Sequence, residues 1–247
     1  MVSELQDEET ALQGAIIAAG RGERLRRGGD DVPKPLVKLG GETLLARQAR
    51  AMVQAGARSV IAIVNSETAS IIDREKIVLP DELSMMVRDT ANSMESLLSL
   101  GEVLPPGNFL LATVDAIIAD AEFEKFIAAS SAIITKTDRR GFDAVLGVVK
   151  WRGDKRPLFA KISAQREIVA LGGEETPLVT AGIYLLPTGI FDFGDEARRA
   201  KLSALRRFLA MLIDQGLRLG AVELADAIDI DEAADLAAAR AAVKEGR

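Results

Sequence analysis

The sequence predicts an α/β fold with a mostly parallel central sheet and a more antiparallel C-terminal half. Two patterns along the 247 residues lead to this prediction. Up to about residue 143, short apolar runs alternate with segments of helical spacing, which favours parallel strands covered by helices on both faces. Beyond that point, strand-like segments follow one another across polar turns, which favours antiparallel pairing. No repeat or low-complexity linker interrupts the chain, so we expect one domain over residues 1–247.

The first half alternates strands and helices. Its clearest helix, at 43–55, places Leu44, Ala49 and Met52 on one face, with Thr43 as the expected N-cap and Gly56 as the C-terminal stop. We expect strands at 15–19, 59–64, 84–87 and 109–114, and helices at 43–55, 66–74, 93–104 and 122–129.

The second half contains more strands and ends in helices. We expect strands at 144–151, 158–163, 167–171, 179–186 and 217–224, and helices at 196–215 and from about 232. Ligands of open α/β sheets bind beyond the carboxyl ends of the strands. The residues that directly follow each strand are therefore the first candidates for a site.

Composition narrows the chemistry. The chain has no cysteine and no histidine, which excludes disulfides, thiolate catalysis, zinc–cysteine sites, histidine bases and histidine metal ligands. Carboxylates, lysine, arginine, hydroxyls, backbone amides and a hard metal ion remain. The net charge of -6 argues against a nucleic-acid partner.

Targeting segments are not apparent. No apolar run reaches the about 18 residues of a membrane span, so no membrane association is expected. The start, MVSELQDEET, is acidic and polar, unlike a signal peptide, and we expect a cytoplasmic protein.

A glycine loop, Gly20-Arg21-Gly22, follows the first predicted strand. Glycines let backbone amides approach a phosphate closely, and arginine and lysine side chains add donors and charge. Taken alone, the loop is open to three interpretations: a phosphate cradle, a dinucleotide fingerprint, or a solvated surface loop. The dinucleotide fingerprint would need a third glycine where this chain has Leu25, and a P-loop pattern is absent.

Five segments in order resemble the nucleotidyltransferase family, which includes sugar-phosphate nucleotidylyltransferases, alcohol-phosphate cytidylyltransferases and MobA-like NTP transferases. They are the glycine loop with Pro-Lys-Pro-Leu and Leu-Gly-Gly-Glu-Thr-Leu-Leu after it, Asn-Ser-Met-Glu-Ser-Leu at 92–97, the strand ending at Asp115, Thr-Ala-Gly-Ile-Tyr at 180–184, and Asp-Ile-Asp at 229–231. The resemblance implies a three-layer, Rossmann-like nucleotide-diphospho-sugar transferase fold, with residues 14–142 binding nucleotide, 143–247 binding acceptor, and 1–13 as an extension.

The resemblance also implies a reaction. A nucleoside monophosphate, CMP as first choice and UMP as second, would pass from an NTP to a phosphorylated sugar, polyol or amino alcohol, and pyrophosphate would leave. The implied partners are thus an NTP and a small phosphorylated acceptor, with Mg²⁺ as cofactor. The acceptor's identity and the oligomeric state are not predicted.

The resemblance assigns roles to particular residues. Lys34 and Arg24 would be catalytic, and Asp115 and Asp231 would bind the metal, with Asp229 as a substitute ligand. The nucleotide would be bound by Ala18, Ala19, Gly20, Arg21, Gly22, Asn92 and Ser93, and the acceptor by Thr180, Ala181, Gly182 and Lys161.

The residues alone leave a structural role open for each aspartate. Asp115 could cap the following helix, and an aspartate before the last helix is a common N-cap. We therefore expect one of Asp229 and Asp231 to cap and the other to bind metal. The basic residues 150, 152, 155 and 156 are interpreted mainly as solvated charges at strand edges.

Departures from the family pattern support one alternative. Val114 precedes Asp115 where the family usually has glycine or serine, and Ala116 follows it where polar residues are frequent. Glu232-Ala233 replaces Thr-Pro. A nucleotide-binding regulatory protein without turnover is therefore a second hypothesis. A dinucleotide-dependent oxidoreductase is disfavoured by Leu25 and the Pro-Lys-Pro loop, and a glycosyltransferase by the lack of Asp-x-Asp at Asp115.

Overall fold

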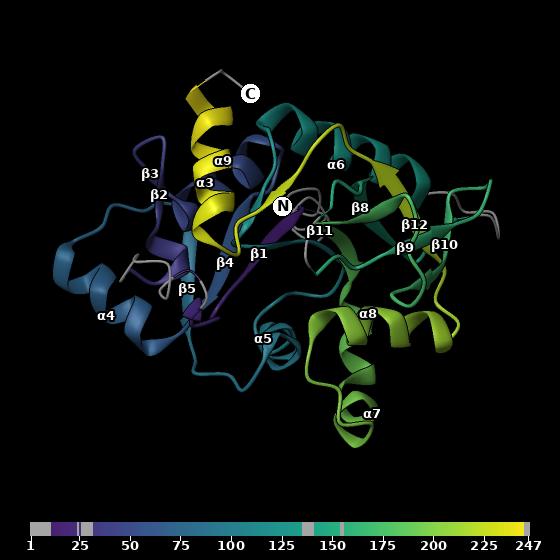
Figure 1. Cartoon of the computed structure of the whole chain (residues 1–247). Coiled ribbons are helices and arrows are strands. Elements are labelled where there is room, and N and C mark those ends of the chain that lie inside the picture. Colours follow the sequence, from purple (N-terminus) through teal and green to yellow (C-terminus); the bar gives the residue numbers. More distant parts are fainter. Residues whose placement is uncertain (1–10, 24, 26–31, 135–140, 154–155, 245–247) are drawn as a thin grey trace, which may run out of the picture.

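A computed structural model describes residues 11–23, 25, 32–134, 141–153 and 156–244 (Figure 1). Within these residues one nine-stranded sheet runs through the molecule, in the order β5-β4-β1-β6-β11-β8-β12-β10-β9. Its strands are β1 (Gln13–Ala18), β4 (Ser59–Val64), β5 (Leu83–Val87), β6 (Asn108–Thr113), β8 (Ala144–Lys150), β9 (Ala160–Ile162), β10 (Glu167–Leu171), β11 (Leu178–Pro187) and β12 (Leu219–Glu223).

The strand directions confirm the predicted change of character. β5, β4, β1 and β6 are parallel, whereas β11 is antiparallel to both β6 and β8. β12 runs parallel to β8, and β10 is antiparallel to β12 and β9. The fold is therefore α/β, parallel in the N-terminal half and mixed in the C-terminal half.

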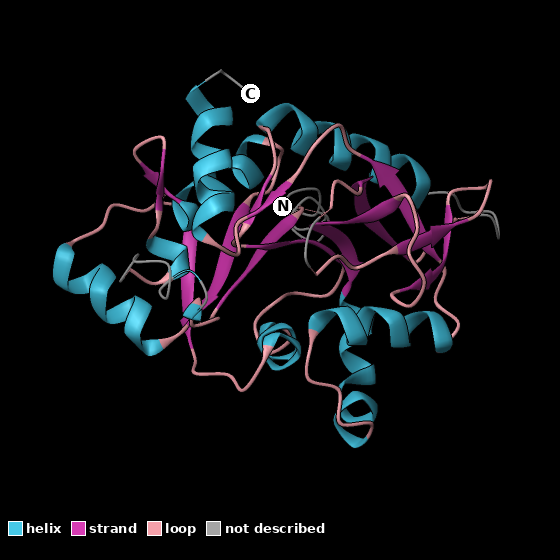
Figure 2. Cartoon of the chain, viewed as in Figure 1, coloured by secondary structure: helices cyan, strands magenta, loops and turns pink. Residues whose placement is uncertain are grey.

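Helices cover both faces of the sheet, which makes three layers (Figures 1 and 2). One face carries α3 (Leu44–Gln54), α4 (Ser66–Glu75), α6 (Asp120–Ile134) and α9 (Ala233–Lys244). The other carries α5 (Ser93–Leu100), α7 (Gly194–Arg199) and α8 (Leu205–Asp214). Short elements complete the chain: the 3-10 turns η1 (Lys34–Leu36) and η2 (Thr188–Phe193), and the strand pairs β2 (Lys38–Leu39) with β3 (Glu42–Thr43), and β7 (Ala116–Ile117) with β13 (Ile228–Asp229).

The central strand β1 shows why the sheet has two cores. Successive side chains of a strand point to opposite faces. Ile16 and Ala18 lie in the core beneath α3, while Ala15 and Ile17 lie in the core beneath α5 and α8. Because all four are apolar and buried, β1 reads in the sequence as a continuous apolar run, as expected for a strand covered on both sides.

Helix α3 begins and ends as predicted. The Thr43 hydroxyl accepts the N–H of Ala46 at 3.2 Å, and so caps the N-terminus. Gly56 follows the helix with φ of +104°, a conformation that glycine adopts at little cost.

Two predicted helices differ from the structure. The helix expected over 93–104 ends at Leu100. The single helix expected over 196–215 is two helices, α7 and α8, separated at Lys201, which has φ of +55°. Ala197 and Leu205 have the spacing expected for one apolar face of a continuous helix, which is why the sequence predicts a single helix. Both are buried, but Ala197 belongs to α7 and Leu205 to α8. Within the described ranges, no helix has the length and apolar character needed to cross a membrane.

Candidate active site

A cleft of about 970 Å³ opens at the carboxyl ends of β1, β4, β5 and β6. Its size lies within the range of small-molecule sites. Most residues predicted for the site line it: Ala19, Gly20, Arg21, Gly22, Lys34, Asn92, Ser93, Asp115, Thr180, Ala181, Gly182, Asp229 and Asp231. Two predicted residues do not line the cleft: Ala18 is buried within β1, and Lys161 is exposed on β9. Arg24 lies outside the described residues, so its predicted role stays a prediction.

Three carboxylates gather at the centre of the cleft. Asp115 follows β6, Asp229 ends β13, and Asp231 comes two residues later. One carboxylate oxygen from each lies within 4.8 Å of the others. The two segments are joined by the β7–β13 pairing and by the N–H of Ile230, which donates to the Asp115 carbonyl at 3.0 Å. The backbone thus fixes the relative position of acids more than a hundred residues apart.

Lys34 contacts this acidic cluster directly. Its Nζ lies 2.8 Å from Oδ2 of Asp115 and 3.1 Å from Oδ1 of Asp231. Only 9% of the residue is exposed. Burial lowers the pKa of Lys34, but its contacts with the two carboxylates raise it by more, so it lies above the usual value. The ammonium therefore remains charged at neutral pH.

The glycine loop packs against the same lysine. Gly22 has φ of +62°, and a Cβ at this position would lie 3.0 Å from Cβ of Lys34. A side chain there would be strained and would crowd the lysine. Gly22 thus allows the loop after β1 to pass beside Lys34, which η1 holds between Pro33 and Pro35.

Asp229 has a raised pKa. Surrounding protein atoms displace water from the carboxylate and disfavour its charged form, which is the largest cause of the raised pKa of about 7. The negative charges of Asp115 and Asp231 raise the pKa further, and the positive charge of Lys34 lowers it. The residue is exposed to the cleft, and water there screens part of this effect. A nearby cation would stabilise the charged form of this carboxylate.

The acidic cluster has the composition of a magnesium site. Mg²⁺ prefers oxygen ligands and is commonly held by one or two carboxylates together with water and substrate phosphates. Asp115, Asp229 and Asp231 supply such ligands. Both Asp229 and Asp231 lie in the cluster, and the carboxylate of Asp235 accepts the N–H groups of Asp231 and Glu232 at 3.0 and 2.7 Å. The expected division, with one of the two as helix cap and the other as metal ligand, stays a prediction.

Gly182 brings β11 against the turn between β6 and β7 that carries Asp115. It has φ of +76°, and the pairing of β11 with β8 shifts register around it. A Cβ at this position would lie 2.5 Å from Cβ of Ala116 and 2.8 Å from Oγ1 of Thr113. The Ala-Gly step in this strand therefore permits a close approach to the segment that carries Asp115.

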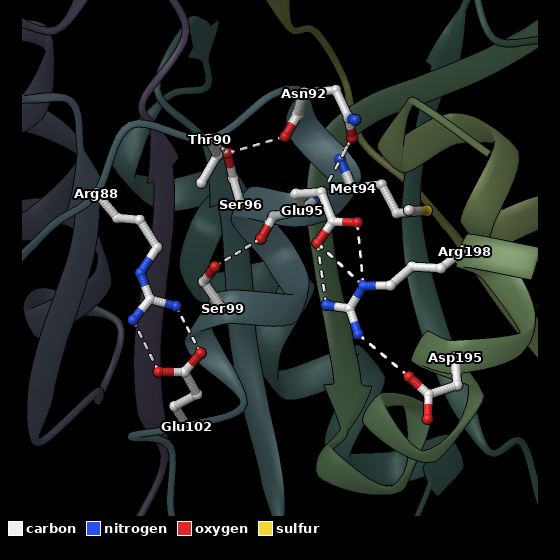
Figure 3. A network of polar contacts seen from close by, with 10 residues as sticks. All are labelled: Arg88, Thr90, Asn92, Met94, Glu95, Ser96, Ser99, Glu102, Asp195 and Arg198. Atoms are coloured by element: carbon white, nitrogen blue, oxygen red, sulfur yellow. Dashed lines mark hydrogen bonds and ion pairs between the residues drawn. The ribbon is translucent and has the colours of Figure 1, made fainter. Parts of the chain in front are cut away.

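Asn92 and Ser93 have structural partners as well as a place in the cleft. Oδ1 of Asn92 accepts the N–H groups of Met94 and Glu95, which caps α5 (Figure 3). The Ser93 hydroxyl accepts the N–H of Leu205 at 2.9 Å, at the start of α8. Towards a ligand, the amide of Asn92 and the hydroxyl of Ser93 therefore present hydrogen-bond donors.

A polar network holds α5 in position (Figure 3). The Arg198 guanidinium donates two bonds to the Glu95 carboxylate, at 3.0 and 3.1 Å, and so ties α7 to α5. At the other side, Arg88 pairs with Glu102 just beyond the helix. These pairs are largely exposed, so each contributes little to stability. Their effect is to fix the orientation of the helix whose N-terminus reaches the cleft.

Several cleft residues were not predicted. Asn65 caps α4 and donates from its amide to the Ala19 carbonyl at 3.1 Å, which anchors the start of the glycine loop. It directly follows β4, so the strand-end rule could have found it. Arg206 on α8 also lines the cleft, together with Arg152 and Arg156, which were interpreted as solvated charges. No local pattern marks these arginines, because their position depends on the packing of α8 and the β8–β9 connection.

Solved structures share this fold over nearly the whole chain. The inositol-1-phosphate CTP transferase from T. maritima has a TM-score of 0.74 and 17% identity, over 96% of this chain and 98% of that one. A putative glucose-1-phosphate thymidylyltransferase from Bacillus anthracis gives 0.78 and 17%, over 95% and 96%. CTP:phosphocholine cytidylyltransferase from Streptococcus pneumoniae gives 0.71 and 17%, over 94% and 99%. At these identities the likeness shows the fold alone.

Sequence comparison identifies the family of the chain. No curated protein sequence matches the chain significantly. The profile of the MobA-like NTP transferase domain, however, matches residues 14–179, about two thirds of the chain, which include the glycine loop, Lys34 and Asp115. This match confirms the resemblance drawn from the five segments, and the chain belongs to the MobA-like NTP transferase family of nucleotidyltransferases.

Proposed function

We propose that this protein transfers a nucleoside monophosphate, CMP first and UMP second, from an NTP to a phosphorylated sugar, polyol or amino alcohol. The observation that carries the proposal is the contact of Lys34 with Asp115 and Asp231 at the end of β6. In the sheet, β6 lies between β1, which leads into the glycine loop, and β11, which carries residues 180–182. The reacting groups would meet at this boundary, with nucleotide on one side and acceptor on the other.

The nucleotide side is built for phosphates and a pyrimidine edge. The backbone amides of Gly20–Gly22 and the Arg21 guanidinium would bind the β and γ phosphates. Asn92 and Ser93 present donors, which suit the O2 acceptor shared by cytosine and uracil. Arg24 stays a prediction for the phosphates. Two of the similar structures are an inositol-1-phosphate CTP transferase and a CTP:phosphocholine cytidylyltransferase, which supports CTP as the first nucleotide to test.

The acceptor side is cationic. Arg152, Arg156 and Arg206 line the cleft together with Thr180 and its neighbours. Guanidinium groups bind phosphate oxygens well, so this side suits a phosphorylated acceptor. Tyr184 is the one aromatic side chain among the described lining residues. A quaternary ammonium group is usually bound by several aromatic faces, which favours a sugar or polyol phosphate over phosphocholine.

The proposed chemistry needs no general base. An oxygen of the acceptor phosphate, already ionised, attacks the α-phosphorus in line, the bond from that phosphorus to the bridging oxygen breaks, and pyrophosphate leaves. Lys34 would stabilise the charge that develops on the α-phosphate oxygens, as a preorganised donor. Asp115, Asp229 and Asp231 would hold Mg²⁺, which when bound supplies charge neutralisation and alignment of the two phosphates. The chain's contribution is thus positioning and electrostatics.

A matrix of four NTPs against several phosphorylated acceptors, read by pyrophosphate release, tests the proposal. We expect release only when an NTP, Mg²⁺ and a phosphorylated sugar or polyol are all present, with CTP turned over fastest. Asp115→Asn serves as the inactive reference. Tight NTP binding with no pyrophosphate release across the matrix would refute transfer and favour a regulatory nucleotide-binding protein.

A further inference from the structure

A buried side-chain amide lies next to the turn formed by Val114 and Asp115, between β6 and β7. Gln48, on the inner face of α3, is 2% exposed. Its Nε2 donates to the backbone carbonyl of Thr113 at 3.2 Å and to that of Ala116. Because both partners are acceptors, the nitrogen of the amide must face them, and each of its two N–H bonds has a partner.

The carbonyls of Thr113 and Ala116 lie on either side of the turn that carries Asp115, the proposed metal ligand. Val114 and Asp115 form the turn between β6 and β7, and the bonds from Gln48 reach the residues on either side of it. A turn of this length often closes with a backbone bond from its fourth residue to its first. In this turn the Gln48 side chain, from another element, additionally binds the carbonyls at both ends, so the direction of the Asp115 side chain is coupled to that amide.

We propose that Gln48 is a positioning residue for the metal site: its amide sets the conformation of the turn that aims Asp115 at the cation. The inference rests on the proposed function, because it takes the carboxylates as metal ligands. Residues that orient a ligand from behind typically change metal affinity by about 10–100-fold when replaced.

The other supports of the turn leave this role to Gln48. Ile230 donates to the Asp115 carbonyl, and β13 pairs with β7, which fixes the end of the turn nearest Asp229. Gly182 limits its outer side by close approach. Among the side-chain hydrogen bonds of the described residues, those from Gln48 reach both ends of the turn around Asp115.

The test is metal binding to the nucleotide-free protein, measured with Mn²⁺ by electron paramagnetic resonance and with Mg²⁺ by calorimetry. Gln48→Met keeps the approximate volume and removes the donor. We expect its Mn²⁺ affinity to fall about 10-fold, with metal-free nucleotide binding unchanged. In turnover, we expect the Mg²⁺ concentration for half-maximal rate to rise, with the rate largely restored at saturating Mg²⁺.

Gln54→Met is the matched control, because Gln54 has the same side chain on the same helix but is exposed. We expect it to bind Mn²⁺ like the wild type. An Mn²⁺ affinity of folded Gln48→Met within twofold of the wild type would overturn the inference, as would a loss of rate that Mg²⁺ does not restore.

A second variant keeps the test decisive if Gln48→Met does not fold. Gln48→Asn retains the amide on a shorter side chain that cannot span both carbonyls, so we expect a smaller but clear loss of Mn²⁺ affinity, and unchanged affinity would overturn the inference. The proposed function fails separately. Intact ion binding without pyrophosphate release would refute transfer and leave the role of Gln48, whereas turnover by a protein that binds no ion would refute the role of Gln48.

Discussion

Lys34 occupies the position in which it neutralises the carboxylates that would bind a metal ion. Its Nζ is 2.8 and 3.1 Å from oxygens of Asp115 and Asp231. Replacing it with glutamine leaves the acidic cluster without this cation. We therefore expect Lys34→Gln to lower stability in the presence of EDTA, and excess Mg²⁺ to restore most of the loss by supplying the missing positive charge.

The distances set the size of the effect. At an effective dielectric constant of about 20, the two contacts correspond to about 6 and about 5 kcal/mol of attraction. Burial of the ammonium offsets most of this, and the carboxylate side chains of Asp115 and Asp231 keep 23% and 24% of their surface exposed. The net loss in the free energy of unfolding should lie between the small contribution of an exposed ion pair and the cost of breaking a buried one, at about 2 kcal/mol. For a chain of this length that is about 4–8 °C in Tm.

Thermal unfolding followed by circular dichroism, in EDTA and in Mg²⁺, measures the effect. Lys38→Gln is the control, because Lys38 is exposed four residues along the chain, and it should melt with the wild type in both conditions. We also expect Lys34→Gln to bind Mn²⁺ more tightly than the wild type when no nucleotide is present. The reasoning would be refuted if Lys34→Gln melted with the wild type in EDTA, or if Mg²⁺ stabilised both proteins equally.

Four further predictions follow from the cleft. Asp115→Ala should lower kcat about 10²–10³-fold in the pyrophosphate assay, by analogy with loss of one preorganised electrostatic group; unchanged turnover would exclude it as a metal ligand. Gly182→Ala should cost at least about 2 kcal/mol in urea unfolding, because its φ is +76° and its Cβ would lie 2.5 Å from that of Ala116. Asp229 has a pKa of about 7 in the folded protein, against an ordinary value of 3.8, so the folded state binds its proton more tightly than the unfolded state. Its contribution to the stability of the metal-free protein should therefore fall as the pH rises towards 7, and the affinity for Mg²⁺ should increase over the same interval. Asp229→Asn should weaken both trends. Arg206→Gln should raise KM for the acceptor and leave the Kd of the nucleotide unchanged, and an equal effect on both would contradict an acceptor role.

Much of the fold could be predicted because local patterns encode it. The strands over 59–64 and 167–171 have the predicted bounds, since each is an apolar run or an alternation limited by turn residues. The site could be anticipated for a related reason: carboxyl ends of parallel strands meet at one edge of a sheet. The glycine loop and Asp115 follow neighbouring strands β1 and β6, so the topology alone brings them together.

Contacts between distant elements could not be predicted in this way. Lys34 and Asp231 are 197 positions apart, and nothing in either segment encodes their ion pair. The same holds for Gln48, which reads in the sequence as an ordinary polar residue of an amphipathic helix but lies on its buried side. The break at Lys201 also depends on tertiary packing, since Ser93 fixes the start of α8 from another helix.

The departures from the family pattern around Asp115 have a structural explanation that does not require loss of turnover. Val114 and Ala116 are 5% and 3% exposed, and Ala116 lies against the space that Gly182 leaves open, so a small apolar side chain fits there. Neither position supplies the carboxylate oxygens of the cluster.

The altered tail is compensated in the same way. Where the family has a threonine, this chain has Glu232, and the carboxylate of Asp235, in the first turn of α9, accepts the N–H groups of Asp231 and Glu232 just before the helix. A negative charge in the first turn of a helix is favourable. Asp229 and Asp231 therefore keep their place opposite Asp115 despite the changed sequence. The observations that suggested an inactive protein are thus differences in packing and in the residues before α9, and Lys34, Asp115, Asp229 and Asp231, on which transfer would depend, lie in one cleft.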